Sequence, residues 1–445
     1  MSRRLPANFL GTFGGSMLEN MFKLSQHGTT VRTEVLAGFT TFLTMAYISI
    51  VNPLILADAG MDFGGVFVAT CLAAAFGTFI MGFWANYPIA LAPGMGLNAY
   101  FTYTVVKTLG FTWQVGLGAV FLSGLIFLVI SILPIREQII NAIPRSLKMA
   151  ISAGIGFFLG IIALKNAGIV VDHPATLVTI GDMKTWPVIL AAIGFMVMVA
   201  LDRRSVPGAI IIGILLVTIV ASLLGISEFK GVVALPPDPS PVFLQLDLAG
   251  AFQVGLISIV FAFLFVDLFD TAGTLVGVAH RAGLLDKDGR LPRLNRALIA
   301  DSAATSVGAA LGTSTTTSYI ESAAGIKAGG RTGLTAVVVG VLFLLTLFFA
   351  PLAQSVPAFA TAPALLFVAC MMAGGLTDVD WEDVTEYAPA VVTALAMPLT
   401  FSIAHGIGFG LITYAAIKLL SGRFGDIHPA VAILAVLFVI KFAVL

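Results

Sequence analysis

The sequence predicts an all-α polytopic membrane protein with about 14 transmembrane segments. Composition is the first observation: of 445 residues, 58% are hydrophobic and only 10% are charged, whereas a soluble domain carries roughly a quarter charged residues. The second observation is a series of apolar runs, most of them close to the roughly 20 residues that cross a bilayer. The net charge of zero gives no indication of a nucleic-acid partner.

The candidate segments are apolar runs separated by polar or Gly- and Pro-containing turns. A further stretch, 428–445, is short and carries Lys441; we expect it to lie in the membrane interface, with an extra span as the alternative. The first seven runs lie near 35–56, 65–86, 95–107, 114–133, 147–165, 186–201 and 207–226. The second seven lie near 250–277, 297–311, 316–326, 332–350, 360–376, 388–402 and 404–420.

Basic residues are distributed unevenly over the loops that join these runs. With Lys441 set aside, 18 Lys and Arg residues fall on one side and 4 on the other. The positive-inside rule then predicts that both termini are cytoplasmic. We expect the protein to lie in the cell membrane, that is, the inner or plasma membrane. Because each half has an odd number of runs, the second half begins on the opposite side. This predicts two inverted repeats, residues 1–226 and 250–420.

Two runs do not resemble ordinary spans. NYPIALAPGMGLNAYFTYTVV (86–106) is interrupted by Pro and Gly, and GAALGTSTTTSYIESAAGIKAGG (308–330) is rich in Thr, Ser and Gly. Non-helical backbone at membrane depth is tolerated where it lines a cavity or is buried in protein. Each is the third run of its half, and paired interrupted segments indicate the binding site of a transporter.

Ionisable residues inside apolar runs suggest where that site lies. Asp267 and Asp270 are three residues apart on one helical face, and Glu321 follows the Thr-rich break. An acid at the bilayer centre costs about 2.5–3.5 kcal/mol, so each calls for a functional explanation. Asn98, in the other interrupted run, can donate and accept hydrogen bonds to a heterocycle edge. The alternative is that these groups only join packed helices.

Secondary contacts are expected from Tyr47, Phe101 and Tyr319, whose rings can stack on a ligand, and from the hydroxyl of Thr316. The alternative for the aromatic residues is helix packing. We find no phosphate-binding loop, no metal-ligand motif, no cofactor motif and no nucleophile constellation. We therefore expect transport that is passive or driven by an ion gradient, and we do not expect an enzyme.

At these residues the sequence resembles the nucleobase–cation symporters, in the AzgA-like branch of guanine/hypoxanthine and adenine permeases within the xanthine/uracil permease superfamily. The resemblance extends over nearly the whole chain. The stretches that carry it are LAGFTTFLTMAYISIVNPLIL, ALAPGMGLNAYFTYTVV, FVDLFDTAGTLVGVA, GTSTTTSYIESAAGIKAGGRTGLTAVVVG and MMAGGLTDVDWED.

This resemblance implies the uracil-permease fold, with 14 segments in two inverted repeats and with segments 3 and 10 partly extended strand. It implies a core domain of about 33–133 and 250–350, and a gate domain of about 147–226 and 360–420. It also implies proton coupling, elevator movement of core against gate, and a homodimer.

The family's site residues correspond by position to Asp267, Asp270, Glu321 and Asn98, and the Asp-x-x-Asp pattern favours purines. The resulting hypothesis is that Glu321 and Asp267 bind the purine edge and Asn98 completes the pocket. Asp267, Asp270 and Glu321 are the candidates for carrying the coupled proton.

Several alternatives remain open. The same fold serves transporters of uracil, xanthine or inorganic anions, although an anion site favours cations or helix N-termini rather than acids. Adenine is not separated from guanine and hypoxanthine, and sodium is the alternative to the proton.

Overall fold

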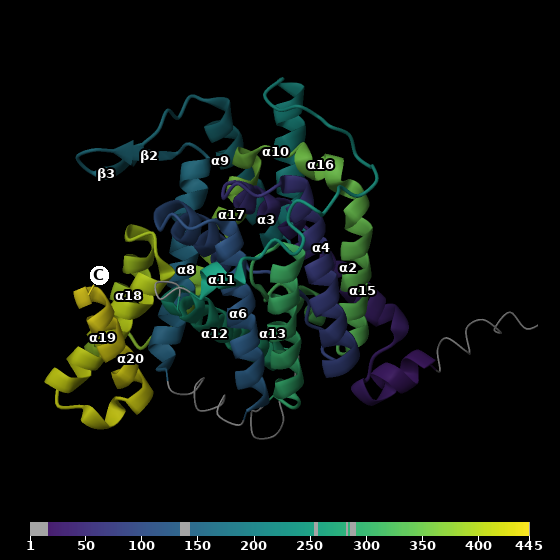
Figure 1. Ribbon diagram of the computed structural model, residues 1–445. Helices are drawn as coiled ribbons and strands as arrows, with labels where there is room; N and C mark the ends of the chain where they lie inside the picture. Colours follow the sequence, from purple (N-terminus) through teal and green to yellow (C-terminus); the bar gives the residue numbers. More distant parts are fainter. Residues whose placement is uncertain (1–16, 134–142, 253–256, 282–283, 285–290, 445) are drawn as a thin grey trace, which may run out of the picture.

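The computed structural model describes residues 17–133, 143–252, 257–281, 284 and 291–444. These residues form a bundle of helices with two very short sheets (Figure 1). Eight helical stretches in the described part of the chain are long and apolar enough to cross a membrane. Four shorter apolar helices accompany them: Ala209–Leu223, Ile259–Leu268, Val384–Leu399 and Pro429–Ala443. The prediction of a helical membrane protein is confirmed, and the count of 14 segments stays a prediction.

In the first half, polar side chains mark where several helices begin. Thr30, Asp62 and Thr112 each accept a hydrogen bond from a backbone N–H of the first turn that follows. The regular elements are α2 (Val31–Met45), α3 (Ile48–Ala57), α4 (Phe63–Ile80), β1 (Leu91–Pro93), α5 (Met95–Ala99), α6 (Trp113–Ile132), α8 (Arg145–Asn166), β2 (Val170–His173), β3 (Leu177–Ile180), α9 (Trp186–Arg203) and α10 (Ala209–Leu223). Met81–Ala85 and Tyr100–Thr108 are π-helical.

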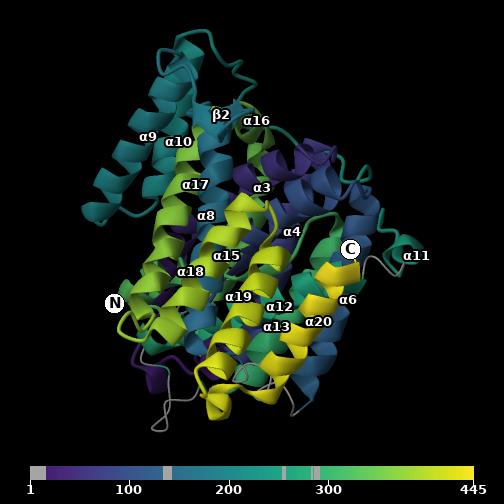
Figure 2. The same ribbon diagram turned by 90° about the vertical axis from the view of Figure 1, so that its left-hand side faces the viewer.

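The second half follows the predicted runs closely, although residues 253–256 of run 250–277 lie outside the described residues. Its elements are α11 (Leu248–Ala251), α12 (Ile257–Arg281), α13 (Leu294–Leu311), β4 (Thr316–Ser318), α14 (Ser322–Lys327), α15 (Gly333–Thr346), α16 (Ala350–Gln354), α17 (Ala358–Ala373), α18 (Val384–Leu399), α19 (Ile403–Leu420) and α20 (Pro429–Val444). Helix α20 covers residues of the stretch expected in the interface and packs against α19 (Figure 2).

The helices pack in two sets. In one set, α6 packs against α13, α2 against α15, and α4 against α3, α13 and α15. In the other, α8 packs against α17 and α18, α9 against α10 and α17, and α18 against α19. Helix α5 packs against α3, and α12 packs against α6, so both belong to the first set. Both also contact α8 of the second set, so the two sets meet beside the interrupted segments.

The two interrupted runs have the same construction, a three-residue strand followed by a short helix. Strands β1 and β4 pair antiparallel, with Leu91 opposite Ser318 and Pro93 opposite Thr316. Two further backbone bonds extend the pairing, from Gly94 N to Thr315 O (2.8 Å) and from Tyr319 N to Ala90 O (3.0 Å). All six strand residues are buried, so each strand satisfies backbone groups of the other where water is excluded. The prediction that both runs depart from regular helix is confirmed.

Candidate functional site

Asp267 on α12 is fully buried against α13. Its Oδ2 lies 3.1 Å from the hydroxyl of Thr305, which is also 2.9 Å from the carbonyl oxygen of Thr316 in β4. That hydroxyl has one hydrogen to share between the two acceptors. The other oxygen, Asp267 Oδ1, has no hydrogen-bond partner among the described residues. The carboxylate therefore has capacity to accept hydrogen bonds from a ligand.

Glu321 lies between β4 and α14 and is half-buried. The hydroxyl of Tyr47, at the start of α3, donates to Glu321 Oε1 at 3.0 Å. Tyr47 is itself fully buried. The structure thus brings together two predicted site residues that are far apart in the sequence, and Tyr47 acts here as a hydrogen-bond donor.

The other two predicted aromatic residues lie at different places. The hydroxyl of Tyr319 donates to the carbonyl oxygen of Pro93 at 2.5 Å, which ties the end of β4 to β1. Phe101 is buried with its ring against α6, where a Cβ at Gly116 would come within 2.7 Å of it. We call the paired strands β1 and β4, with the residues that contact them, the strand junction. Tyr319 is therefore part of the strand junction, and Phe101 packs against a helix.

Asn98 on α5 is fully buried. Its Nδ2 donates to Oδ1 of Asn52 on α3 at 2.5 Å. Its Oδ1 has no partner within the described ranges. Asn98 thus resembles Asp267 in presenting one buried acceptor that protein groups leave unused.

Unused polar atoms concentrate at this junction. Nine buried side-chain atoms lack a hydrogen-bond partner in the part of the chain that the structure describes. Five of these atoms belong to the two interrupted segments or to Asp267 beside them. Buried polar groups are rarely left unpaired. A cluster of them therefore indicates a missing polar partner. The five atoms are Asn98 Oδ1, Asp267 Oδ1, Ser314 Oγ, Thr315 Oγ1 and Thr316 Oγ1.

Asp270 follows Asp267 by three residues on α12 but is only half-buried. The next residue, Thr271, is fully buried, and its hydroxyl lies 2.7 Å from the hydroxyl of Thr317 in β4. The two acids of α12 therefore differ in environment, although they lie on one helical face as predicted.

Sequence reasoning missed a fourth acid at the junction, Asp301 on α13. This fully buried carboxylate accepts from Ser318 N at 2.8 Å, from Ser318 Oγ at 2.9 Å and from Thr271 Oγ1 at 2.7 Å. These donors attach α12 and the end of β4 to α13. The signal was present, because Asp301 lies inside the predicted run 297–311, where an acid calls for an explanation as Asp267 does.

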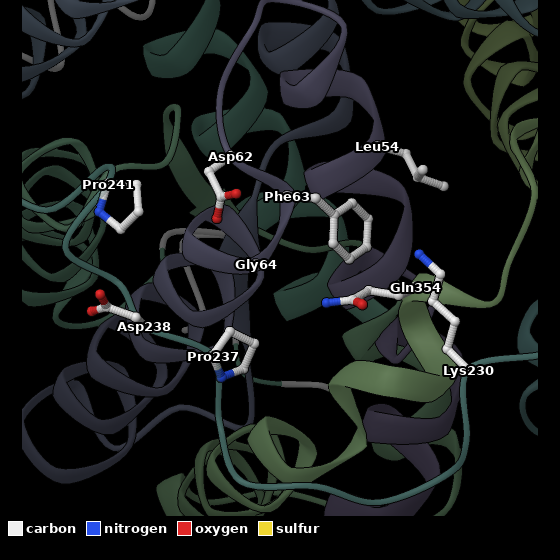
Figure 3. Close-up of a pocket in the computed structure, with 9 residues that line it drawn as sticks. All are labelled: Leu54, Asp62, Phe63, Gly64, Lys230, Pro237, Asp238, Pro241 and Gln354. Atoms are coloured by element: carbon white, nitrogen blue, oxygen red, sulfur yellow. The ribbon is translucent and has the colours of Figure 1, made fainter.

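A separate cavity of about 640 Å³ opens where the segment before α11 passes the start of α4 (Figure 3). Asp62, Lys230 and Asp238 give it charges of both signs, and the described residues that line it include none of the predicted site residues. Asp62 already caps α4, and hydrogen bonds from Ser240 hold the pKa of Asp238 below its usual range. The full lining is Leu54, Asp62, Phe63, Gly64, Lys230, Pro237, Asp238, Pro241 and Gln354.

A helical membrane fold in which two interrupted segments meet beside buried acids defines a polytopic membrane transport protein. Among the described residues, no group of three or more His, Cys, Asp or Glu side chains is placed to hold a metal ion. A model of the xanthine/uracil permeases, described as "Permease family", matches residues 32–409. The chain belongs to this family, whose members are permeases and not enzymes.

Known proteins resemble the chain over nearly its full length. It is 49% identical to the adenine permease AdeP of Escherichia coli (strain K12), over 97% of each chain. It is 45% identical to the guanine/hypoxanthine permease PbuO of Bacillus subtilis (strain 168), over 96% of this chain and 100% of that one. The resemblance to nucleobase permeases that the sequence analysis described is confirmed.

Among solved structures, the transmembrane domain of the cyanobacterium bicarbonate transporter BicA has a TM-score of 0.64. The match covers 84% of this chain and 97% of that one, at 16% sequence identity. At this identity the likeness shows a shared fold and says nothing of the ligand.

Proposed function

We propose that the protein is a secondary active transporter that imports purine nucleobases, adenine or guanine and hypoxanthine, by proton symport. The observation that carries this proposal is the group of unpartnered polar atoms around the strand junction, above all Asp267 Oδ1 and Asn98 Oδ1. These purines have ring N–H donors for these acceptors, and adenine and guanine also have an exocyclic amino group. These purines also have ring nitrogens that accept from hydroxyl groups such as that of Thr316. The adenine and guanine/hypoxanthine permeases among its relatives support the same ligand class.

The proposed pocket uses the residues expected from the sequence. Asp267 and Glu321 bind N–H groups on the purine edge, and Asn98 accepts a further one. Asp270 is half-buried, as Glu321 is, and follows Asp267 by three residues on α12. Tyr47 supports this arrangement, because its hydroxyl fixes one oxygen of Glu321 and leaves the other for a ligand.

Proton coupling follows from the cost of moving a buried charge. A carboxylate that loses water without gaining a cation or enough donors is strongly unfavourable in the membrane interior. Uptake of a proton by Asp267, Asp270 or Glu321 removes that charge before the loaded site crosses the bilayer. Sodium is the alternative coupling ion, and a gradient experiment separates the two.

The transport movement that we propose is an elevator, in which a core of about 33–133 and 250–350 moves against a gate of about 147–226 and 360–420. The division of helix contacts into two sets supports this partition. In this proposal 14 segments form two inverted repeats, both termini are cytoplasmic, and the protein lies in the plasma or inner membrane. The homodimer is also part of the proposal, and light scattering on the purified protein tests it.

Inorganic anions are the alternative substrate class, since the bicarbonate transporter BicA shares the fold. The buried carboxyl groups of Asp267 and Asp301 count against an anion, because like charges repel in a medium of low dielectric constant. Uracil and xanthine are further alternative substrates, and competition against adenine, guanine and hypoxanthine tests them.

The experiment is uptake of radiolabelled hypoxanthine and adenine by cells that express Asp267→Asn or Glu321→Gln. Each variant should lose at least about 90% of uptake, because removing one partner of a buried polar contact costs about 1–3 kcal/mol and the proton site is lost as well. Asp238→Asn, in the separate cavity near the start of α4, is the control and should transport as the wild type does. Normal uptake by both site variants would refute the assignment of the site.

A further inference from the structure

Asn52, on α3, connects three elements at the strand junction. Its side chain is fully buried, and Nδ2 donates to the hydroxyl oxygens of Thr70 on α4 (2.7 Å) and Thr313 before β4 (2.9 Å). Its Oδ1 accepts from Nδ2 of Asn98 at 2.5 Å. Every polar atom of this amide is therefore used by side chains from other elements.

The direction of the Asn52 amide follows from the hydroxyl of Thr70. Thr70 Oγ1 donates its single hydrogen to the carbonyl oxygen of Val66, one turn earlier in α4, at 2.6 Å. Toward Asn52, Thr70 can then only accept. Asn52 must present its NH₂ group to Thr70, so its Oδ1 lies on the other side, toward Asn98.

The direction of the Asn98 amide follows in turn. Because Asn52 presents an acceptor, Asn98 must donate through Nδ2, and Asn98 Oδ1 is left unpartnered among the described residues. We propose that Thr70 and Asn52 are positioning residues for specificity: they fix Asn98 as a hydrogen-bond acceptor, so that the site selects ligands with an N–H group at that position. We call Val66 O, Thr70, Asn52 and Asn98 the amide relay.

This inference rests on the proposed function, since it names which atom of position 98 meets the purine. A purine whose N–H points at Asn98 Oδ1 forms a hydrogen bond. A ligand with a ring nitrogen or carbonyl oxygen there places two acceptors together. Loss of the relay would let the Asn98 amide turn over, and we expect the apparent affinity to fall about 5- to 50-fold.

The test compares Thr70→Val with Thr70→Ser. Valine keeps the volume of threonine and removes the hydroxyl, whereas serine keeps the hydroxyl and removes the methyl group. Thr218→Val is a matched control, because Thr218 on α10 is also buried and its hydroxyl also donates to a carbonyl one turn earlier, that of Ile214 at 2.8 Å. Initial rates of radiolabelled hypoxanthine and adenine uptake give KM and the maximal rate for each variant.

The relay predicts a KM raised about 5- to 50-fold in Thr70→Val with the maximal rate within about twofold, and near-normal values in Thr70→Ser and Thr218→Val. A role in packing alone predicts the reverse order, with serine more harmful than valine. Either that order or an unchanged KM in Thr70→Val would overturn the inference.

A second variant keeps the test decisive if Thr70→Val does not fold. Thr70→Ala also removes the hydroxyl that fixes the direction of the Asn52 amide, so its KM should again exceed that of Thr70→Ser. If the wild type takes up neither base, the purine assignment fails and the inference with it. If wild-type uptake is normal and the Thr70 variants without a hydroxyl match Thr218→Val, the inference fails alone.

Discussion

The Glu321 carboxylate is held at one oxygen, Oε1, by the Tyr47 hydroxyl. The Tyr47 hydroxyl that holds Oε1 at 3.0 Å comes from α3, more than 270 residues earlier in the chain. A carboxyl group fixed at one oxygen presents the other in a defined direction, which favours a planar ligand with N–H groups along one edge. Tyr47 is thus a positioning residue for Glu321 in the proposed site.

Tyr47→Phe tests that role with the loss of a single oxygen atom. We expect KM for purine uptake to rise about 3- to 10-fold, because the net value of one such hydrogen bond is about 0.5–1.5 kcal/mol. Tyr414→Phe is the control, since the Tyr414 hydroxyl also lies near a carboxylate, that of Glu386, at 3.5 Å. Tyr414 is on the C-terminal half of α19 and is not part of the proposed site. Equal KM values in the two variants would contradict the assignment.

The sequence predicted the residues of the proposed site but not their hydrogen-bond partners. Asp267, Glu321 and Asn98 stood out because polar groups at membrane depth are costly wherever the chain folds. The donor role of Tyr47 and the amide contact from Asn52 depend on which helices become neighbours, and one-dimensional spacing does not contain that information. Asp301 could have been found by the same cost argument.

The same limit holds for the interrupted segments. Pro and Gly in 86–106, and Thr, Ser and Gly in 308–330, predicted that both runs depart from helix, and β1 and β4 do so. Their pairing to each other and their register, with Ala92 opposite Thr317, join residues 225 positions apart. Strand β4 packs against α12 and α13, and β1 packs against α4, so the register depends on how these helices come together.

The start of α18 shows how a charged cap stabilises a helix at the edge of the bundle. Asp383 Oδ1 accepts from the Thr385 backbone N–H at 2.9 Å and from its hydroxyl at 2.7 Å, and Oδ2 accepts from Arg423 at 2.5 Å. The Thr385 hydroxyl, and then the Arg423 guanidinium, hold the pKa of Asp383 well below its usual range. The ionised form is therefore favoured in the folded protein.

This cap predicts a pH-dependent contribution to stability. A depressed pKa stabilises the fold at pH values above the unfolded pKa of about 3.9, and the contribution is lost as pH falls through the folded value. Asp383→Asn should lower the melting temperature by a few degrees at pH 7, and the difference from the wild type should shrink below about pH 4. Melting curves of the purified protein from pH 3 to 8 measure it, with Asp380→Asn as control. A difference that is constant over this range would contradict the account.

At the scale of the whole molecule, a hydrogen bond between Thr104 and Phe401 joins the two helix sets of the proposed elevator. The Thr104 hydroxyl, in the π-helical segment 100–108, donates to the carbonyl oxygen of Phe401 between α18 and α19 at 2.6 Å. If the core moves against the gate, this bond breaks in the other state. Its loss should therefore shift the balance between states without touching the proposed pocket.

Thr104→Val tests this movement. Spin labels on exposed positions of the two sets, Ile132→Cys on α6 and Leu420→Cys on α19, report their distance in a chain whose exposed Cys370 is replaced by serine. We expect two distance populations, with the one that matches this structure depleted about 2- to 10-fold in Thr104→Val. A single distance distribution, unchanged by the variant and by added purine, would count against the elevator.

The most direct test of the central claim is uptake of radiolabelled hypoxanthine and adenine by proteoliposomes under an imposed inward proton gradient. We predict accumulation that a protonophore abolishes and that replacement of sodium leaves unchanged. Unlabelled adenine, or guanine and hypoxanthine, should compete more strongly than uracil, xanthine or bicarbonate. No accumulation of either base, in liposomes shown to contain folded protein, would contradict the account and leave only the fold and the family.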